Sequence, residues 1–176
     1  MFETEHLILR RFTDDDADAI FAMRADADFM RFIKQPDTRA ESLAWVRMVS
    51  RYWETENFGF WAVVEKAAGE TIGWSGSWIL QETWETEIGF AIARKFWGRG
   101  FATEAARVAL NYGFENRKAE RVVAVAKPEN AASRRVMEKL GMRLERQRFF
   151  KSYDLELVYY SLEREKYARN PKTAAA

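Results

Sequence analysis

Apolar residues along this chain recur with two spacings, one typical of strands and one typical of helices. Runs rich in β-branched and aromatic residues, bounded by turn residues, predict strands. Such runs lie at residues 7–12, 59–65, 70–80, 86–93, 121–126, 143–150 and 155–162. The pattern therefore predicts a sheet of about seven strands, in which residues 59–93 form an antiparallel meander.

Other segments carry apolar residues at helical spacing, namely residues 17–25, 39–52, 101–116 and 131–140. Asp14, Asp15 and Asp16 precede the first of them. Carboxylates at a helix start satisfy free N–H groups, so this triplet indicates a cap before it indicates a metal site. The order of elements predicts an α/β (α+β) domain with a central mixed, mostly antiparallel sheet and helices on both faces.

Composition limits the class of protein. A chain of 176 residues has the length of one domain, expected over residues 1–168 with a disordered tail at residues 169–176. The absence of cysteine excludes disulfides, thiolate metal ligands and a catalytic thiol. Lys and Arg number 28 against 27 Asp and Glu, a net charge of +1, which gives no broad argument for nucleic acid. Without a leader-like start or an apolar run of ~20 residues, a soluble cytoplasmic protein is expected.

Residues 95–104 form a glycine-punctuated loop between a predicted strand and a predicted helix. Gly98 and Gly100 allow a sharp turn and close approach of a ligand, and the first turn of the following helix offers unpaired N–H groups to an anion. The loop is therefore a candidate phosphate cradle that needs no metal. It matches neither the P-loop nor the Gly-x-Gly-x-x-Gly dinucleotide motif.

A second motif, Lys127-Pro128-Glu129-Asn130-Ala131-Ala132-Ser133, follows an apolar run and opens a predicted helix. Together with the loop it resembles the GNAT acyltransferase superfamily, whose signature is Gln/Arg-x-x-Gly-x-Gly/Ala with a later Asn-led helix. Lys95 stands at the Gln/Arg position. The phrases Glu87-Ile88-Gly89-Phe90 and Glu138-Lys139-Leu140-Gly141-Met142 resemble the ribosomal-protein N-terminal acetyltransferase branch.

This resemblance covers residues 4–162 and implies a GNAT-like domain that binds acetyl-CoA as co-substrate, without a metal. It implies that the strand before the loop exposes backbone groups to the pantetheine arm and that the loop holds the pyrophosphate. Asn130 matches an asparagine that contacts the pantetheine arm, although Asn is also a good helix N-cap. The cofactor-binding residues expected on this basis are Phe90, Ala91, Ile92, Trp97, Gly98, Arg99, Gly100, Phe101, Ala102, Thr103 and Asn130.

The acid that protonates the departing thiolate is less clearly marked. Many family members have a tyrosine in the last helix motif, and the matching residue here is Met137, which cannot donate a proton. The ribosomal-type branch has instead a serine three residues after the asparagine, which falls on Ser133. Ser133 is therefore expected to donate a proton or a hydrogen bond to the thiolate. A serine in a first helical turn is equally a local backbone partner.

The acceptor ammonium must lose a proton before it attacks the carbonyl carbon, which requires a positioned carboxylate. Glu87 is the first candidate for this catalytic base, because it begins the strand that the resemblance places beside the thioester. The alternative is an exposed carboxylate at a strand end. Asp154, in the predicted turn between the last strands, is the second candidate. His6 and Glu104 are not expected to act in catalysis.

Most of the seven tryptophans lie between Trp53 and Trp84. Core packing is the simpler interpretation for each of them. A sharper hypothesis is an aromatic-walled acceptor pocket, built from Phe29, Trp53, Phe58, Trp74, Trp78 and Trp84.

These features predict an N-acetyltransferase that moves an acetyl group from acetyl-CoA to a primary amine by direct transfer in a ternary complex. The amine is a protein N-terminal α-amine or a small molecule. The alternative function is a module that binds acyl-CoA as a sensor and transfers nothing, which Met137 favours. A monomer or homodimer is expected, without membrane or nucleic-acid partners.

Overall fold

The computed structural model describes residues 1–33 and 37–169. Contacts divide the chain into two compact units, one comprising Met1–Gly76 with Phe90–Ala105 and the other Ser77–Gly89 with Ala106–Ala176. The expected tail lies, from residue 170 onward, outside the described residues. The single domain expected over residues 1–168 stays a prediction.

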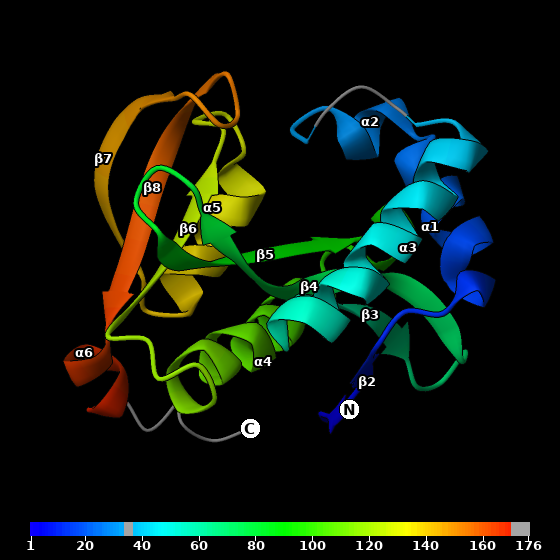
Figure 1. Cartoon of the computed structure of the whole chain (residues 1–176), viewed down its shortest axis with the longest axis horizontal. Coiled ribbons are helices and arrows are strands. Elements are labelled where there is room, and N and C mark those ends of the chain that lie inside the picture. The colour runs from blue at the N-terminus through cyan, green and yellow to red at the C-terminus, as the bar shows by residue number, and fades with distance from the viewer. Residues whose placement is uncertain (34–36, 170–176) are drawn as a thin grey trace. The chain divides into compact units, whose positions relative to one another are not determined.

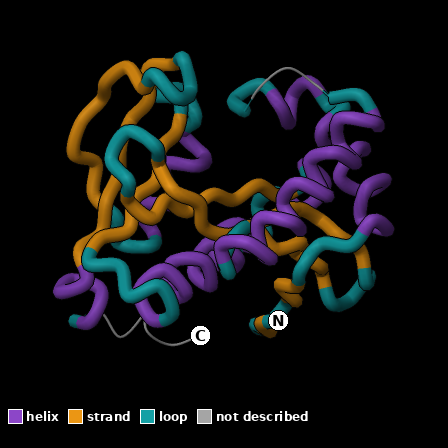
Figure 2. Tube along the Cα trace, in the orientation of Figure 1, coloured by secondary structure: helices purple, strands orange, loops and turns teal. Residues whose placement is uncertain are grey.

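The described residues form strands and helices joined by loops and turns (Figure 1; Figure 2). The strands are β1 (Phe2–Glu3), β2 (Leu7–Arg10), β3 (Phe60–Glu65), β4 (Glu70–Leu80), β5 (Glu85–Ile92), β6 (Arg121–Ala126), β7 (Arg143–Phe150) and β8 (Leu155–Glu163). The helices are α1 (Ala17–Arg24), α2 (Ala27–Met30), α3 (Arg39–Glu56), α4 (Phe101–Glu115), α5 (Ala131–Lys139) and α6 (Arg164–Ala168).

Within the described residues the strands form an 8-stranded sheet in the order β1-β2-β3-β4-β5-β6-β8-β7. β5 and β6 pair in parallel, whereas β2–β3, β3–β4, β6–β8 and β7–β8 pair antiparallel. The expected α/β fold with a mixed, mostly antiparallel sheet is confirmed. The additional strand is β1, which has 2 residues and is too short to show an apolar period.

In the first unit, helices cover both faces of the sheet. Ile20 of α1 and Val49 of α3 pack with Ala62 of β3 and Trp74 of β4 in one core cluster. The neighbouring Ser75 points to the opposite face, where its hydroxyl donates a hydrogen bond of 3.1 Å to the carbonyl of Ala105 in α4. Successive side chains of β4 thus point to opposite faces of the sheet, so that Trp74 packs with α1 and α3 and Ser75 contacts α4.

In the second unit a smaller apolar cluster lies around β4, β6, β7 and β8. It contains Leu80, Val123, Phe150, Leu157 and Tyr159. α4 approaches β5 and β6 at Gly113, where an added Cβ atom would lie 3.0 Å from Val122 and 3.6 Å from Thr86. Thr86 therefore faces α4, and the next residue of β5, Glu87, faces the other side of the strand.

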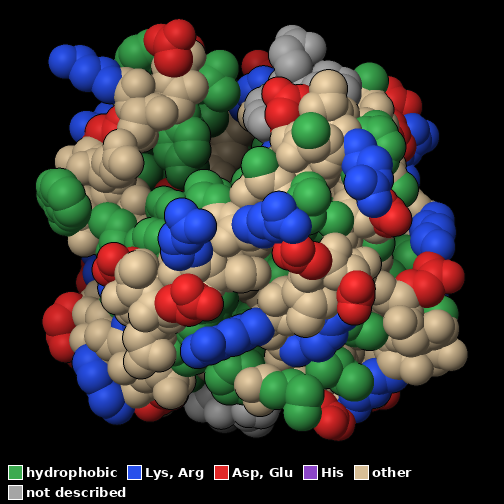
Figure 3. Space-filling model, turned by 45° about the vertical axis from the view of Figure 1, so that its right-hand side comes forward, with side chains coloured by type: hydrophobic (Ala, Val, Ile, Leu, Met, Phe, Trp, Pro, Cys, Tyr) green, Lys and Arg blue, Asp and Glu red, His purple; other side chains and the backbone are tan. Residues whose placement is uncertain are grey.

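The surface drawn in Figure 3 carries Lys and Arg side chains interspersed with Asp and Glu side chains. This mixture agrees with the near-zero net charge of +1. Among the described residues, no helix is both long enough and apolar enough to cross a membrane.

Candidate active site

The glycine loop leads from the end of β5 into the first turn of α4. After Ile92 the chain makes a 3₁₀ turn at Arg94–Phe96 and passes through Gly98 and Gly100, whose φ angles are +80° and +87°. These left-handed conformations favour glycine. Among the described residues, no protein acceptor is found for the backbone N–H groups of residues 98–102, whereas those of Thr103 and Glu104 donate to the carbonyl of Gly100. The loop thus presents consecutive free N–H groups at a helix N-terminus, an arrangement that fits a pyrophosphate.

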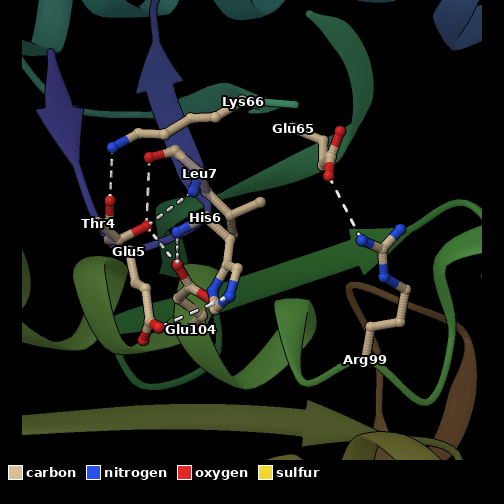
Figure 4. A network of polar contacts seen from close by, with 8 residues as sticks. All are labelled: Thr4, Glu5, His6, Leu7, Glu65, Lys66, Arg99 and Glu104. Carbon is tan, nitrogen blue, oxygen red and sulfur yellow. Dashed lines mark hydrogen bonds and ion pairs between the residues drawn. The ribbon is translucent and has the colours of Figure 1, made fainter. Parts of the chain in front are cut away.

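The start of α4 is fixed to the N-terminal segment through Glu104 (Figure 4). Its carboxylate accepts hydrogen bonds from the Thr4 hydroxyl at 2.5 Å and from the His6 backbone N–H at 2.9 Å, and Nδ1 of His6 lies 3.0 Å away. Burial alone would raise the pKa of Glu104, but these bonds outweigh it and hold the pKa below its usual range. The Glu104 carboxylate therefore ties the first turn of α4 to Thr4 and His6.

Three cationic side chains surround the loop, each with a carboxylate partner. Arg99 lies 3.4 Å from Glu65 (Figure 4). The Arg99 guanidinium also lies over the Phe101 ring, 4.5 Å from its centroid. Lys95 contacts Glu70, and Arg94 donates to Asp28 at 2.7 Å. Positive groups at a helix N-terminus add to its attraction for an anion.

The strand before the loop loses its parallel partner early. β5 and β6 pair only at Thr86–Val122 and Glu87–Val123, although both strands continue. Further along β5, Phe90 and Ala91 are half-buried, and the indole N–H of Trp97 donates to the carbonyl of Ile92 at 2.5 Å. The interrupted ladder leaves part of the β5 edge without the hydrogen bonds that a regular sheet would supply.

Glu87 is buried in β5 with 8% of its surface exposed. The Tyr153 hydroxyl, from the turn between β7 and β8, donates to its Oε2 at 2.8 Å. Burial raises the pKa of Glu87 to about 7, the Tyr153 hydrogen bond opposes this rise, and the nearby Glu82 charge adds to it. The alternative of an exposed strand-end carboxylate is therefore wrong. A carboxyl group with a pKa near neutral pH is suited to acid–base chemistry.

The turn that carries Tyr153 is fixed to the turn between β4 and β5. The carboxylate of Glu82 accepts hydrogen bonds from the backbone N–H of Ser152 at 2.6 Å and from its hydroxyl at 2.5 Å. Sequence reasoning missed Glu82, Ser152 and Tyr153. Each lies in a predicted turn, and no local spacing signals a contact between turns so distant in the chain.

Asn130 and Ser133 meet at the start of α5. The Asn130 side chain accepts a hydrogen bond of 3.1 Å from the backbone N–H of Ser133, so Asn130 is the N-cap of α5. Both residues are half-buried. Met137, at the position expected for a tyrosine, has 2% of its surface exposed and belongs to the core.

Asp154 is exposed at the end of the β7–β8 turn, with a φ angle of +53°. Its neighbour Tyr153, rather than Asp154, reaches the buried carboxylate of Glu87.

A pocket of about 1090 Å³ lies within the first unit. Its lining includes Met23 and Phe29 beside the charged residues Arg10, Asp16 and Arg94. Of the six aromatic residues proposed to form one pocket, Phe29 alone contributes to this lining among the described residues. Trp53, Phe58 and Trp74 are buried with at most 6% exposure, whereas Trp84 is 80% exposed. Core packing accounts for the three buried residues.

The Asp14–Asp16 triplet forms a 3₁₀ turn ahead of α1. The Asp16 carboxylate accepts hydrogen bonds from the Arg10 guanidinium at 2.7 and 2.8 Å and from the Thr71 hydroxyl at 2.6 Å. Within residues 1–33 and 37–169, no cluster of three or more His, Asp or Glu side chains is arranged to hold a metal ion.

The family model described as an acetyltransferase (GNAT) domain matches residues 6–143. The chain belongs to this family and is an acetyltransferase of the GNAT type.

Individual relatives agree with this assignment. The chain is 30% identical over 148 residues to the uncharacterized N-acetyltransferase YoaA of Bacillus subtilis, covering 82% of this chain and 84% of that protein. It is 35% identical over 133 residues to the FsC-acetyl coenzyme A-N(2)-transacetylase of Aspergillus fumigatus, covering 65% of this chain and 54% of that protein. A crystal structure of a GNAT-family acetyltransferase from Bacillus anthracis matches with a TM-score of 0.80 and 27% identity, covering 93% of this chain and 98% of that one.

Proposed function

We propose that this acetyltransferase moves an acetyl group from acetyl-CoA to a primary amine by direct transfer in a ternary complex. The observation that carries the proposal is the set of N–H groups at residues 98–102 for which the described residues supply no acceptor. These groups offer a pyrophosphate a site at the start of α4. The names of the N-acetyltransferase relative and of the acetyl coenzyme A transacetylase support acetyl-CoA as the donor and an amine as the acceptor.

Acetyl-CoA supplies the reactive thioester. The loop from Trp97 to Thr103 would hold its pyrophosphate through backbone N–H groups, with Arg99 adding positive charge. Backbone groups of Phe90, Ala91 and Ile92 would bind the pantetheine arm along the open edge of β5. Asn130 would contact the same arm from the start of α5. Holding both reactants together supplies about 7–11 kcal/mol of the barrier in the best intramolecular models, so modest acid and base groups suffice.

Glu87 is the proposed general base. Its pKa of about 7 leaves a substantial ionised fraction at neutral pH, and the carboxylate can then accept a proton from the acceptor ammonium, directly or through water. Once neutral, the amine nitrogen attacks the acetyl carbonyl carbon. The buried position of Glu87 strengthens its interaction with a nearby cation.

Ser133 is the proposed partner of the departing thiolate. Its backbone N–H is used by the Asn130 cap, so its hydroxyl is the group proposed to donate. The buried Met137 offers no donor.

The acceptor is proposed to be a protein N-terminal α-amine or a small amine. The phrase Glu87-Ile88-Gly89-Phe90 supports the ribosomal-protein N-terminal acetyltransferase branch, and hence the first class. A peptide that begins with a free α-amine and the same peptide with its terminus blocked separate the two classes, since only the first class requires the free terminus.

The proposal is tested by calorimetry with acetyl-CoA, followed by release of free thiol with a panel of amines and N-terminal peptides. Gly98→Trp and Gly100→Trp place a bulky side chain in the loop. Gly69→Trp is the matched control, because Gly69 also has a positive φ, +67°, and open space around it. We expect loss of binding in the loop variants alone and amine-stimulated thiol release in the wild type. Binding of acetyl-CoA without thiol release from any amine would favour the alternative of an acyl-CoA sensor. If acetyl-CoA does not bind, the proposal is wrong.

A further inference from the structure

The turn between β7 and β8 contributes one side chain to the buried carboxyl group of β5. Tyr153 is 42% exposed as a whole residue, yet its hydroxyl lies 2.8 Å from Oε2 of Glu87. The Tyr153 hydroxyl thus supplies a hydrogen-bond donor to Glu87, a carboxyl group that has little contact with water. The hydrogen bond stabilises the charged form of the carboxyl group, because a hydroxyl can only donate to a carboxylate.

The same turn is anchored by a second pair of hydrogen bonds. Glu82, in the turn between β4 and β5, holds both the backbone N–H and the hydroxyl of Ser152. Ser152 directly precedes Tyr153, so this anchor restricts where the tyrosine hydroxyl can lie. Glu82 is also the charged group whose field opposes ionisation of Glu87. The two turns therefore place one stabilising group and one opposing charge beside the same carboxyl group.

We propose that Tyr153 is the positioning residue of the acyl transfer, which orients the Glu87 carboxylate and keeps it available to accept the proton of the acceptor amine. This inference rests on the proposed function of Glu87 as the base. Tyr153 itself neither gains nor loses a proton, since burial and the neighbouring carboxylates raise the pKa of its hydroxyl far above neutral pH.

Among the described residues, the titratable groups that act on Glu87 come from two turns. Tyr153 approaches from the β7–β8 turn and Glu82 from the β4–β5 turn. On the adjacent strand β6 the register partner is the apolar Val123. Removing the Tyr153 hydroxyl should therefore move the titration of Glu87 to higher pH. Glu82→Gln removes the charge but keeps an oxygen that can accept from Ser152, so it should move the titration to lower pH. General loss of structure in the two variants would not be expected to shift the Glu87 titration in opposite directions.

The test uses the full chain with ¹³C-labelled glutamate carboxyl groups. The Glu87 signal is identified by its loss in Glu87→Gln, and its titration is compared in wild type, Tyr153→Phe and Glu82→Gln. The pH dependence of kcat/KM for thiol release with one amine is measured on the same proteins. We expect Tyr153→Phe to move the Glu87 titration to higher pH by roughly one unit, together with the acid limb of the pH profile of kcat/KM. Glu82→Gln should move both to lower pH.

Tyr159→Phe is the matched control. The Tyr159 hydroxyl donates to Oε2 of Glu85 at 2.5 Å, so it forms the same type of pair two residues earlier on β5. Its loss should leave the Glu87 titration and the acid limb in place. If it moves them as far as Tyr153→Phe does, the effect belongs to general loosening and the inference is wrong.

Failure of the inference and failure of the proposed function give different results. An unchanged carboxyl titration in Tyr153→Phe overturns the inference, as does a shifted titration with an unchanged acid limb. If no amine elicits thiol release from the wild type, the proposed function fails. In that event the carboxyl titration alone decides: an upward shift supports Tyr153 as the group that holds Glu87, and no shift overturns it.

Discussion

Glu104, in the first turn of α4, accepts a hydrogen bond of 2.9 Å from the backbone N–H of His6. The contact joins the start of the chain to the helix that follows the glycine loop. Because the same carboxylate also holds Thr4, the loop is supported on one side by a residue that belongs to no part of the family motif.

Replacing Glu104 by Ala should lower the free energy of unfolding by about 2 kcal/mol at neutral pH, because the bonded donors lose their acceptor. Since the pKa of Glu104 is depressed in the folded protein, its stabilisation is present above its ordinary pKa of about 4.3 and lost as the pH falls through the folded value. Urea unfolding at pH 7 and pH 3 measures the difference. Glu129→Ala, at an exposed position, should have little effect at either pH. An equal loss at both pH values for Glu104→Ala would contradict the assignment.

Asn130 is proposed to serve both as the cap of α5 and as a contact for the pantetheine arm, and two substitutions separate the roles. Asn130→Ala removes the cap and should cost about 1 kcal/mol of stability, whereas Asn130→Ser keeps a capping oxygen and should cost much less. Both should weaken binding of acetyl-CoA in calorimetry. Unchanged affinity in the stable Asn130→Ser protein would leave Asn130 with the structural role alone.

Asp16 joins β2, α1 and β4 through bonds to Arg10 and Thr71 and has 3% of its surface exposed. Asp16→Asn leaves the Arg10 guanidinium without its charged partner and should lower the free energy of unfolding by about 3 kcal/mol. Asp18→Asn, which removes an exposed ion pair with Arg39, is the control and should change little. Urea unfolding measures the free energy of unfolding of both variants. If Asp16→Asn and Asp18→Asn lose comparable stability, burial of the Asp16–Arg10 pair does not explain the loss.

Glu87 should make the protein less stable as pH rises. Its pKa is raised to about 7 in the folded state, so the folded protein keeps a proton that the unfolded chain releases near pH 4.3. The stability it contributes is therefore complete below that pH and is lost on the way to pH 7, by an amount on the order of 3 kcal/mol. Glu87→Gln should flatten this part of the stability profile between pH 5 and pH 8. An unchanged slope would show that the folded carboxyl group has an ordinary pKa.

Much of the fold follows from local pattern. The bounds expected for β4, β6 and β7 agree with the structure at Glu70–Leu80, Arg121–Ala126 and Arg143–Phe150, because turn residues punctuate these apolar runs. α2 was missed because it has 4 residues and cannot show a helical period. Its start at Asp26, which caps Asp28 and Phe29, is the signal that a search for caps would find.

The candidate site was harder to predict because its groups are brought together by pairing rather than by local sequence. Glu87 lies on a central strand covered on both sides, so Thr86, Glu87 and Ile88 are all buried and show no polar–apolar alternation. Its burial could not be read from the pattern. The Tyr153 contact spans 66 positions in the chain, and its register depends on the β5–β6–β8–β7 order.

The most direct test of the proposed base is the pH dependence of amine-stimulated thiol release by the wild type and by Glu87→Gln, with one acceptor amine. The ionisation of the amine is common to both proteins and cancels in the ratio of their kcat/KM values. We predict that kcat/KM of the wild type divided by that of Glu87→Gln rises with pH through about 7, the pKa of Glu87, and then becomes constant. A ratio that does not vary with pH would contradict the assignment of Glu87 as the general base.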